Sequence, residues 1–328
     1  MIIFFYYFYN TKLKIMELKN IYPYPSIIHP QVEKIEINSQ QWAISHGLAK
    51  AEYLNVIKVG HLLGRALPNA KVELVTICCQ LAICIYIIDD YCEKNGVKTV
   101  KQIISVFTNI LEDQTINNDN NELSSIILPF QNIWLDLKKS SPLSWQQHFK
   151  KNMHDYLHAL LWEAKNREAN NVPNIDEYIK MRNHSAGVYW TLNLMEFSDE
   201  YFLPDSIRNN VMIKEIEHTA SQIMYSINDF FSAERELQLQ DFHNLVIVYN
   251  KHENITVKEA MYKVLDFHNE QLKKFIEYEN AYLHFEKEDA IMVKKYITAI
   301  SKLIRGHLDW SIIDIPRYKK YNILLEEF

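Results

Sequence analysis

Glycine and proline are scarce in this sequence, with six glycines and nine prolines among 328 residues. Few turn signals therefore interrupt the chain, and several apolar stretches run for more than twenty residues with helical spacing. The sequence also lacks an alternation of strands and helices, a glycine-rich phosphate loop and a Gly-x-Ser-x-Gly elbow. These absences argue against the common nucleotide-binding and serine-hydrolase patterns and favour an all-α protein.

Basic residues are fewer than acidic residues in this sequence. The chain has 35 Lys and Arg residues against 41 Asp and Glu, a formal net charge of -6, and no run of basic residues. Nucleic acid is therefore not expected as a partner, because binding to its backbone depends on clustered basic side chains. An acidic enzyme that acts on an anionic substrate needs cations at the site itself.

Cysteine is rare and confined to one segment. Cys78, Cys79, Cys84 and Cys92 all fall within fifteen residues, with neither zinc-type spacing nor distant pairing partners. We expect them to be reduced and buried as small apolar side chains.

The first fifteen residues are apolar but do not form a convincing targeting signal. They lack a basic region and a small-residue cleavage site, and they are too short to span a bilayer. A second methionine, Met16, offers an alternative start. We expect a disordered tail over residues 1–20, one helical domain over residues 21–328, no stable membrane anchor and a cytoplasmic location.

Helical patterns begin near Ser39 and recur to about Gly306. The longest apolar helix follows Pro68-Asn69, and Asn95-Gly96 is expected to end it with the usual glycine cap.

A carboxylate cluster, Asp89-Asp90-Tyr91-Cys92-Glu93, closes this apolar helix. Carboxylates there face the negative end of the helix dipole, so a positive group should compensate them. Asp89 and Glu93 are four residues apart on one face and can reach a shared cation, for which oxygen ligands favour Mg²⁺, Mn²⁺ or Ca²⁺ over Zn²⁺. Taken alone, the pattern is also compatible with a solvated helix end.

A second oxygen-rich face combines Asn228, Ser232 and Glu236, which recur every four residues. Arg235 adjoins this face, and its guanidinium suits phosphate oxygens. Asn and Ser have low helix propensity, so finding both on one face of a helix suggests that they have a functional role. A plain polar helix face is the alternative.

Aromatic residues accompany both faces. Tyr86 lies one turn before Asp89, and Tyr225 lies one turn before Asn228. We expect Tyr86, Tyr225, Trp190 and Trp310 to line a pocket, with ordinary core packing as the alternative for each.

Together, D-D-x-x-E and the later N-D-x-x-S-x-x-x-E resemble the two metal-binding motifs of microbial-type class I terpene synthases. Arg182 precedes Asn228 by 46 residues (228 minus 182), where this family carries an arginine that senses the diphosphate. By the same register Ser185 is the family's linker residue, although some relatives have a carboxylate there. A helix break, which Gly187 makes plausible, would then expose the carbonyl of Ala186.

The resemblance runs from about Pro30 to Tyr318 and ends in Arg317-Tyr318, similar to the family's diphosphate-binding pair. It implies a single-domain helical bundle around a central cavity, in which prenyl diphosphate, best farnesyl diphosphate, is ionised and cyclised to a sesquiterpene. It also implies Mg²⁺, usually three ions, with Mn²⁺ as an alternative, and it allows a homodimer. The metal ligands would be Asp89, Asp90, Glu93, Asn228, Ser232 and Glu236, and the diphosphate ligands Arg182, Asn228, Arg235, Arg317 and Tyr318.

Two other functions remain open. A chain-elongating prenyltransferase shares the architecture but needs two aspartate-rich motifs, which Asn228 and Ser232 argue against. A non-catalytic helical binding protein would not need complete ligand sets on both faces. A class II cyclase would carry a D-x-D-D motif, which this sequence lacks.

Overall fold

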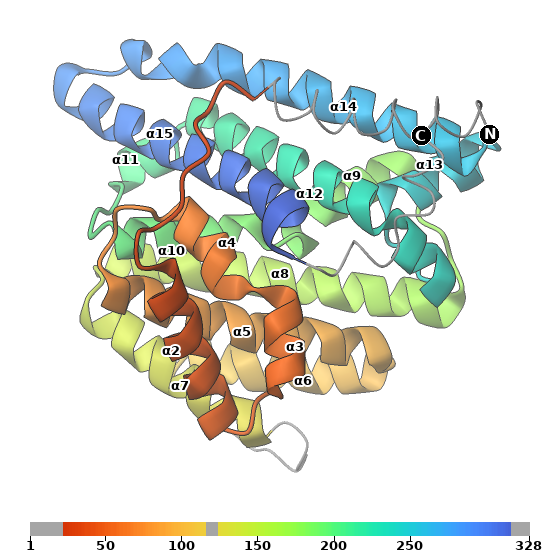
Figure 1. Ribbon diagram of the computed structural model, residues 1–328, viewed down its shortest axis with the longest axis horizontal. Helices are drawn as coiled ribbons and strands as arrows, with labels where there is room; N and C mark the ends of the chain where they lie inside the picture. The colour runs from red at the N-terminus through yellow and green to blue at the C-terminus, as the bar shows by residue number, and fades with distance from the viewer. Residues whose placement is uncertain (1–21, 116–123, 316–328) are drawn as a thin grey trace.

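The computed structural model describes residues 22–115 and 124–315. Within these ranges the chain forms helices and connecting turns without strands, as the scarcity of turn signals predicts (Figure 1). The helices are α2 (Val32–Ser45), α3 (Ala51–Ile57), α4 (Val59–Ala66), α5 (Val72–Lys94), α6 (Val97–Leu111), α7 (Ser124–Lys139), α8 (Leu143–Ala169), α9 (Ile175–Ser185), α10 (Val188–Ser198), α11 (Asp205–Arg208), α12 (Val211–Leu239), α13 (Leu245–Glu253), α14 (Val257–Glu277), the 3₁₀ segment η1 (Tyr278–His284), α15 (Lys287–Asp309) and the π-helical turn η2 (Trp310–Asp314).

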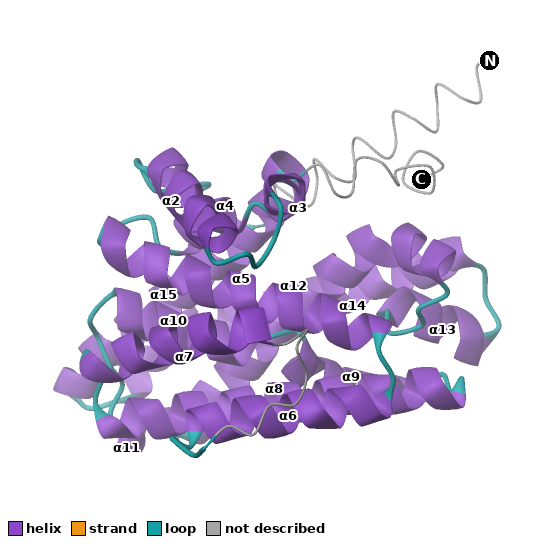
Figure 2. Ribbon diagram, turned by 90° about the horizontal axis from the view of Figure 1, so that it is seen from below, coloured by secondary structure: helices purple, strands orange, loops and turns teal. Residues whose placement is uncertain are grey.

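The long helices pack in layers around a central group. Helix α12 packs against α14, α15 packs against α4, and α8 packs against α6 and α9. In the perpendicular view α8 and α6 lie along one side, while α2, α3 and α4 cover the opposite side (Figure 2). This arrangement surrounds α5, α10 and α12 with other helices on most sides, and these three supply much of the wall of the central pocket.

Helix α5 is the apolar helix that the sequence predicts. Its four cysteines are free and buried, as expected. Among the described helices, α5 is the one with the length and apolar composition to cross a bilayer, but half of its most apolar window is buried inside the protein (50%). Packing in the protein core therefore accounts for its composition.

The end of α5 differs from the prediction. The helix ends at Lys94, just before Asn95 as predicted, but Asn95 has an extended backbone (φ -122°, ψ 151°) and Gly96 is not a left-handed cap (φ -76°). The Asn95 side chain donates to the carbonyl of Tyr91 at 2.8 Å and satisfies one of the free carbonyls of the last turn. Gly96 (φ -76°) instead precedes the first residue of α6.

The first and last helices extend beyond the predicted limits. Helix α2 begins at Val32, and Ser39 is buried inside it with its hydroxyl bonded to the Ile35 carbonyl at 2.8 Å. Gly306 does not end α15, which continues to Asp309. A Cβ at Gly306 would lie 2.8 Å from the Cβ of Arg65, so this glycine allows α15 to pack closely on α4.

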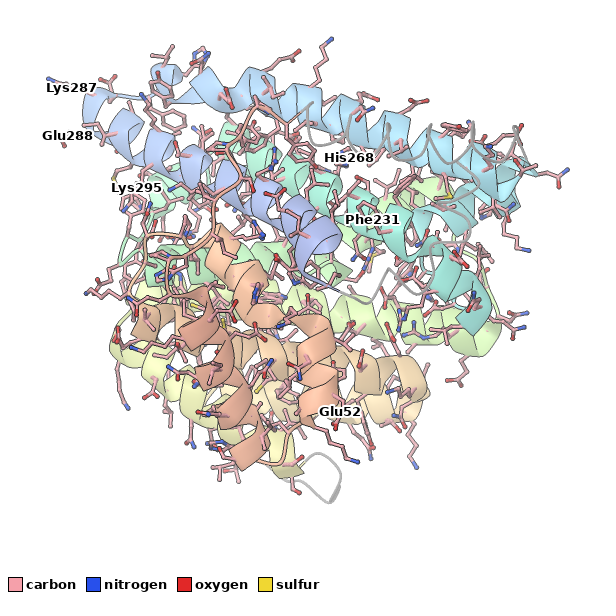
Figure 3. All side chains as sticks on the ribbon, viewed as in Figure 1. Glu52, Phe231, His268, Lys287, Glu288 and Lys295 are labelled. Carbon is pink, nitrogen blue, oxygen red and sulfur yellow. The ribbon has the colours of Figure 1, made fainter. Side chains whose placement is uncertain are left out.

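Charged side chains occupy the outer surface, as Lys287, Glu288 and Lys295 of α15 and Glu52 of α3 illustrate (Figure 3). By contrast, His268 of α14 is fully buried between helices. Its imidazole is hydrogen-bonded to the hydroxyls of Tyr22 and Ser226, at 2.9 and 3.0 Å, which satisfies both ring nitrogens.

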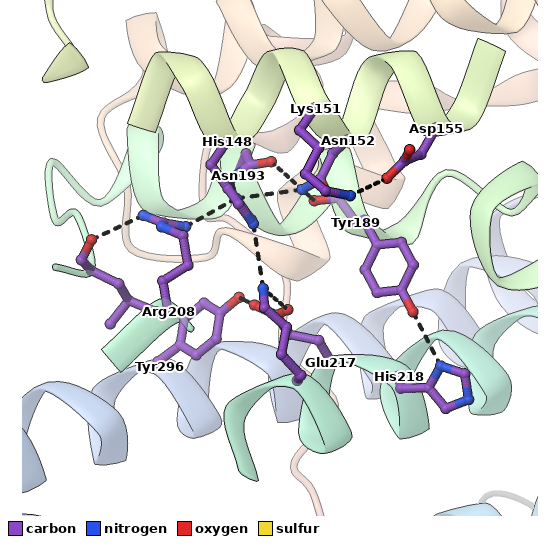
Figure 4. A network of polar contacts seen from close by, with 12 residues as sticks. His148, Lys151, Asn152, Asp155, Tyr189, Asn193, Arg208, Glu217, His218 and Tyr296 are labelled. Atoms are coloured by element: carbon purple, nitrogen blue, oxygen red, sulfur yellow. Dashed lines mark hydrogen bonds and ion pairs between the residues drawn. The ribbon is translucent and has the colours of Figure 1, made fainter. Parts of the chain in front are cut away.

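A second buried polar network fixes α10 against α8, α11 and α12 (Figure 4). Arg208 donates to both carboxylate oxygens of Glu196 at 2.7 Å, and both side chains are almost fully buried. His148 accepts from Arg208 at 3.2 Å and from Asn193 at 3.0 Å through Nδ1. Burial and the neighbouring Arg208 lower the pKa of His148 to about 3, which keeps its ring neutral and able to accept.

Candidate active site

One pocket brings together the predicted site residues. It is lined from α4, α5, α8, α9, α10, α12, α15 and η2, so its wall depends on segments from across the chain. Arg317 and Tyr318 lie outside the described residues. The predicted residues that line the pocket are Tyr86, Asp89, Asp90, Glu93, Arg182, Ser185, Ala186, Trp190, Tyr225, Asn228, Ser232, Arg235, Glu236 and Trp310.

The lining changes character along each helix. On α5 it runs from Ala82 and Ile85 to the carboxylates of Asp89 and Glu93. On α12 it runs from Met224 to Glu236. The pocket therefore has an apolar end and an end rich in oxygen ligands, which suits a molecule with a hydrocarbon part and a charged part.

The first motif holds carboxylates whose charged form is disfavoured by burial. Asp89 accepts from the Tyr156 hydroxyl at 3.0 Å. Burial, reinforced by Glu93 and Glu163, raises the pKa of Asp89 well above its usual value. Burial also raises the pKa of Glu93, although Arg235 partly offsets it. A bound cation would relieve this cost.

The second motif is held by a residue that the motif itself does not contain. Asn244, the N-cap of α13, donates its side-chain amide to Ser232 Oγ at 3.2 Å and to Glu236 Oε2 at 2.6 Å. Its own Oδ1 accepts from the Val246 N–H at 2.8 Å, which fixes the amide orientation. Burial and nearby Asp229 raise the pKa of Glu236 to about 8.

Arg235 lies between the two motifs. Its guanidinium is 4.0 Å from Glu93 of α5 and 3.9 Å from Glu236 of α12. The two carboxylates therefore share one cation across the pocket, and the guanidinium is positioned to meet an anion that enters between them.

Arg182 is fixed by α12. It donates to Asp229 Oδ1 at 2.9 Å and to Asn228 Oδ1 at 3.1 Å through Nη2. Asp229 is fully buried and also accepts from the Tyr178 hydroxyl at 2.6 Å and the Leu245 N–H at 3.0 Å. Asp229 thus orients Arg182 and links α9, α12 and α13.

The chain breaks between α9 and α10 where the sequence suggests. Helix α9 ends at Ser185, whose Oγ accepts from Arg182 Nη1 at 3.4 Å. Gly187 adopts a left-handed conformation (φ 73°) and starts α10. No backbone N–H in the described part of the chain donates to the Ala186 carbonyl, so its oxygen keeps its lone pairs beside the pocket.

The donor set fits a hard divalent cation. Asp89, Glu93, Asn228, Ser232 and Glu236 can each offer a side-chain oxygen, and burial together with neighbouring carboxylates raises the pKa of the three carboxyl groups. Within residues 22–115 and 124–315, no three His, Cys, Asp or Glu side chains are already gathered around one point. The first motif offers the carboxylate oxygens of Asp89 and Glu93. The second motif offers the Glu236 carboxylate together with amide and hydroxyl oxygens from Asn228 and Ser232.

Tyr156, Asp229 and Asn244 are not among the residues that the sequence predicts for the site. Asp229 is part of the N-D pair and Asn244 precedes an apolar run, the pattern of a helix cap. Neither pattern reveals the tertiary contacts that these residues make.

Comparisons with known proteins show the family of this chain. Residues 80–274 match the family model described as "Terpene synthase family 2, C-terminal metal binding". The chain is 31% identical to germacrene A synthase of Nostoc punctiforme over 93% of this chain and 96% of that protein. It is 25% identical to a (+)-T-muurolol synthase of Roseiflexus castenholzii, over 89% and 91% of the two chains.

Solved structures show the same fold. Wild-type cucumene synthase superposes with a TM-score of 0.76 at 18% identity, covering 88% of this chain and 98% of its own. Linalool/nerolidol synthase from Streptomyces clavuligerus, in complex with 2-fluorogeranyl diphosphate, superposes with a TM-score of 0.78 at 18% identity, covering 90% and 98%. With the family model matching more than half of its residues, this chain belongs to the terpene synthase family, whose C-terminal domain binds metal.

Proposed function

We propose that this protein ionises farnesyl diphosphate with Mg²⁺ and converts the resulting carbocation into a sesquiterpene. The observation that carries the proposal is the polarity of one pocket, in which two oxygen-rich motifs, Arg182 and Arg235 accompany an apolar wall. The related Roseiflexus enzyme is described as cyclising (2E,6E)-farnesyl diphosphate, which supports the choice of a fifteen-carbon substrate.

The first step is heterolysis of the carbon–oxygen bond, in which the bonding electrons leave with the diphosphate. When bound, divalent cations at the two motifs would neutralise the charge that builds up on the leaving group. Arg182 and Arg235 bind the same anion through charge-assisted hydrogen bonds. Asp229 holds Arg182 in place, so this guanidinium needs no reorganisation during the reaction.

The allyl cation that remains is guided by the apolar wall. Ala186 lines the pocket and its carbonyl has no backbone donor in the described part of the chain, so it can stabilise positive charge that forms beside it. Rings of Tyr86, Trp190, Tyr225 and Trp310 supply π faces and exclude water, so the chain folds on itself before it is quenched.

Several finer features belong to the same proposal. Mg²⁺ is the expected ion, three per site, with Mn²⁺ able to replace it, and Arg317 and Tyr318 are expected to bind the diphosphate. We also expect a cytoplasmic enzyme without a stable membrane anchor, and the resemblance allows a homodimer.

The test is to incubate purified protein with geranyl, farnesyl and geranylgeranyl diphosphate, with Mg²⁺ or EDTA, and to identify products by gas chromatography and mass spectrometry. We expect Mg²⁺-dependent hydrocarbons or alcohols from farnesyl diphosphate, and none from an Asp89→Ala variant with unchanged circular dichroism. Longer prenyl diphosphates formed with added isopentenyl diphosphate would identify a prenyltransferase instead. No product from folded wild-type protein would support a binding protein.

A further inference from the structure

His307 is a pocket residue that neither motif accounts for. It lies in the last turn of α15, one turn after Leu303, and its side chain lines the same cavity. The residue is 7% exposed, and its Nδ1 is buried without a hydrogen-bond partner in the described part of the chain. Buried polar atoms are rarely left without a hydrogen-bond partner, so the unpartnered Nδ1 of His307 points to a functional role for this residue.

The other histidine of the pocket has a different environment. His243 Nδ1 lies 2.8 Å from Asp241 and 3.3 Å from Arg167, among the charged groups that line the pocket. At the His307 ring, residues 22–115 and 124–315 provide no ion pair and no side-chain hydrogen bond. The His307 ring lies beside the Trp310 ring, with the two ring centroids 5.8 Å apart. His307 therefore presents an imidazole to the cavity beside aromatic and aliphatic groups.

The charge state of His307 is set by its surroundings. Burial, with smaller contributions from His268 of α14 and Arg182 of α9, lowers its pKa to about 4. His268 is itself neutral for the same reason, because burial lowers its pKa to about 4. At neutral pH the His307 ring is therefore uncharged, and one of its two nitrogens carries a free lone pair.

A neutral imidazole is a sufficient base for this pocket. A carbocation with an adjacent C–H bond is a far stronger acid than an imidazolium, even one whose pKa is low. The other unpartnered buried atoms of the pocket include His243 Nε2, whose ring is held through Nδ1 by Asp241 and Arg167 among charged groups. The Tyr225 hydroxyl is a much weaker base, and neither the Trp190 Nε1–H nor the Arg167 guanidinium has a lone pair to offer.

We infer that His307 is the base that ends the reaction, an inference that rests on the proposed function. The C–H bond next to the cationic carbon breaks, its electrons form the new C=C bond, and the proton passes to the free ring nitrogen of His307. The imidazolium then gives this proton to diphosphate or water as the products leave. Each turnover thus releases one olefin, one diphosphate and one proton, and His307 returns to its neutral form.

The experiment compares wild type with His307→Asn and His307→Phe on farnesyl diphosphate. Asn keeps a polar side chain and Phe keeps a ring, but neither can accept the proton. The rate of diphosphate release and the ratio of olefins to alcohols are measured separately. His46→Asn is the matched control, since it makes the same substitution at an exposed histidine outside the pocket.

We expect both His307 variants to release diphosphate at a rate within a few-fold of wild type. The ratio of olefins to alcohols should fall at least about tenfold, because a positioned general base usually contributes more than this to the rate of proton transfer. His46→Asn should keep olefins dominant. An unchanged ratio in both His307 variants, with wild type active, would overturn this inference alone. No terpene product from wild type would overturn the proposed function, and the inference with it.

Discussion

At the scale of single residues, the linear motifs predict candidate metal ligands but not the side chains that hold them in place. Asn228, Ser232 and Glu236 can be predicted because helical spacing alone puts them on one face. Asn244 cannot, because it reaches Ser232 and Glu236 from the start of another helix. Contacts between helices depend on packing, and a single sequence does not specify it.

Replacement of Asn244 tests whether this contact prepares the second motif. We expect Asn244→Ala to raise the Mg²⁺ concentration needed for half-maximal activity by about 10–100-fold, the usual effect of losing a residue that orients metal ligands. The Mg²⁺ dependence of diphosphate release measures this directly. Asn55→Ala, at an exposed position on α3, is the control. Equal Mg²⁺ dependence in wild type and both variants would show that the Asn244 contacts do not prepare the motif.

At the scale of elements, two glycines show what a sequence can and cannot place. The family resemblance predicts a helix break at Gly187, and the backbone there is left-handed (φ 73°). The sequence predicts the same conformation for Gly96 as the cap of α5, but the Asn95 side chain bonds the last turn and Gly96 begins α6. Whether a glycine near a helix end adopts the left-handed conformation depends on which group bonds the free carbonyls of the last turn. At the end of α5 the Asn95 side chain does so.

Gly187→Ala tests the importance of this break. A Cβ there would lie 2.7 Å from Trp190 Nε1, in addition to the cost of a left-handed alanine. We expect a loss of stability that exceeds the roughly 1 kcal/mol of the backbone term alone, together with an altered product profile as Trp190 moves. Gly47→Ala isolates the backbone term, because Gly47 has φ 67° and no atom within 4 Å of its Cβ position.

Urea denaturation and product analysis on both glycine variants separate these effects. If Gly187→Ala costs no more stability than Gly47→Ala and leaves the products unchanged, then Trp190 does not depend on the shape of the break.

At the scale of the whole molecule, the all-α fold follows from the sequence, but the pocket depends on long-range polar contacts. Arg208 and Glu196 illustrate this, because they lie on α11 and α10 and are among the most buried charged groups of the described chain. Nothing in their sequence neighbourhood distinguishes them from surface residues. The packing of α10 and α11 against α12 makes them partners, and α10 in turn carries Trp190 to the pocket.

Glu196→Gln should therefore destabilise the whole domain. The substitution leaves Arg208 buried beside a neutral amide, a loss of roughly 3–5 kcal/mol for a broken buried ion pair. The midpoint of urea unfolding should fall with an unchanged slope, while Glu270→Gln, which removes an exposed partner of Lys274 on α14, should leave the midpoint nearly unchanged. A Glu196 variant as stable as the Glu270 variant would mean that Arg208 finds enough compensation from the Leu203 carbonyl and His148. The network would then fix the position of α10 without contributing much to the stability of the fold.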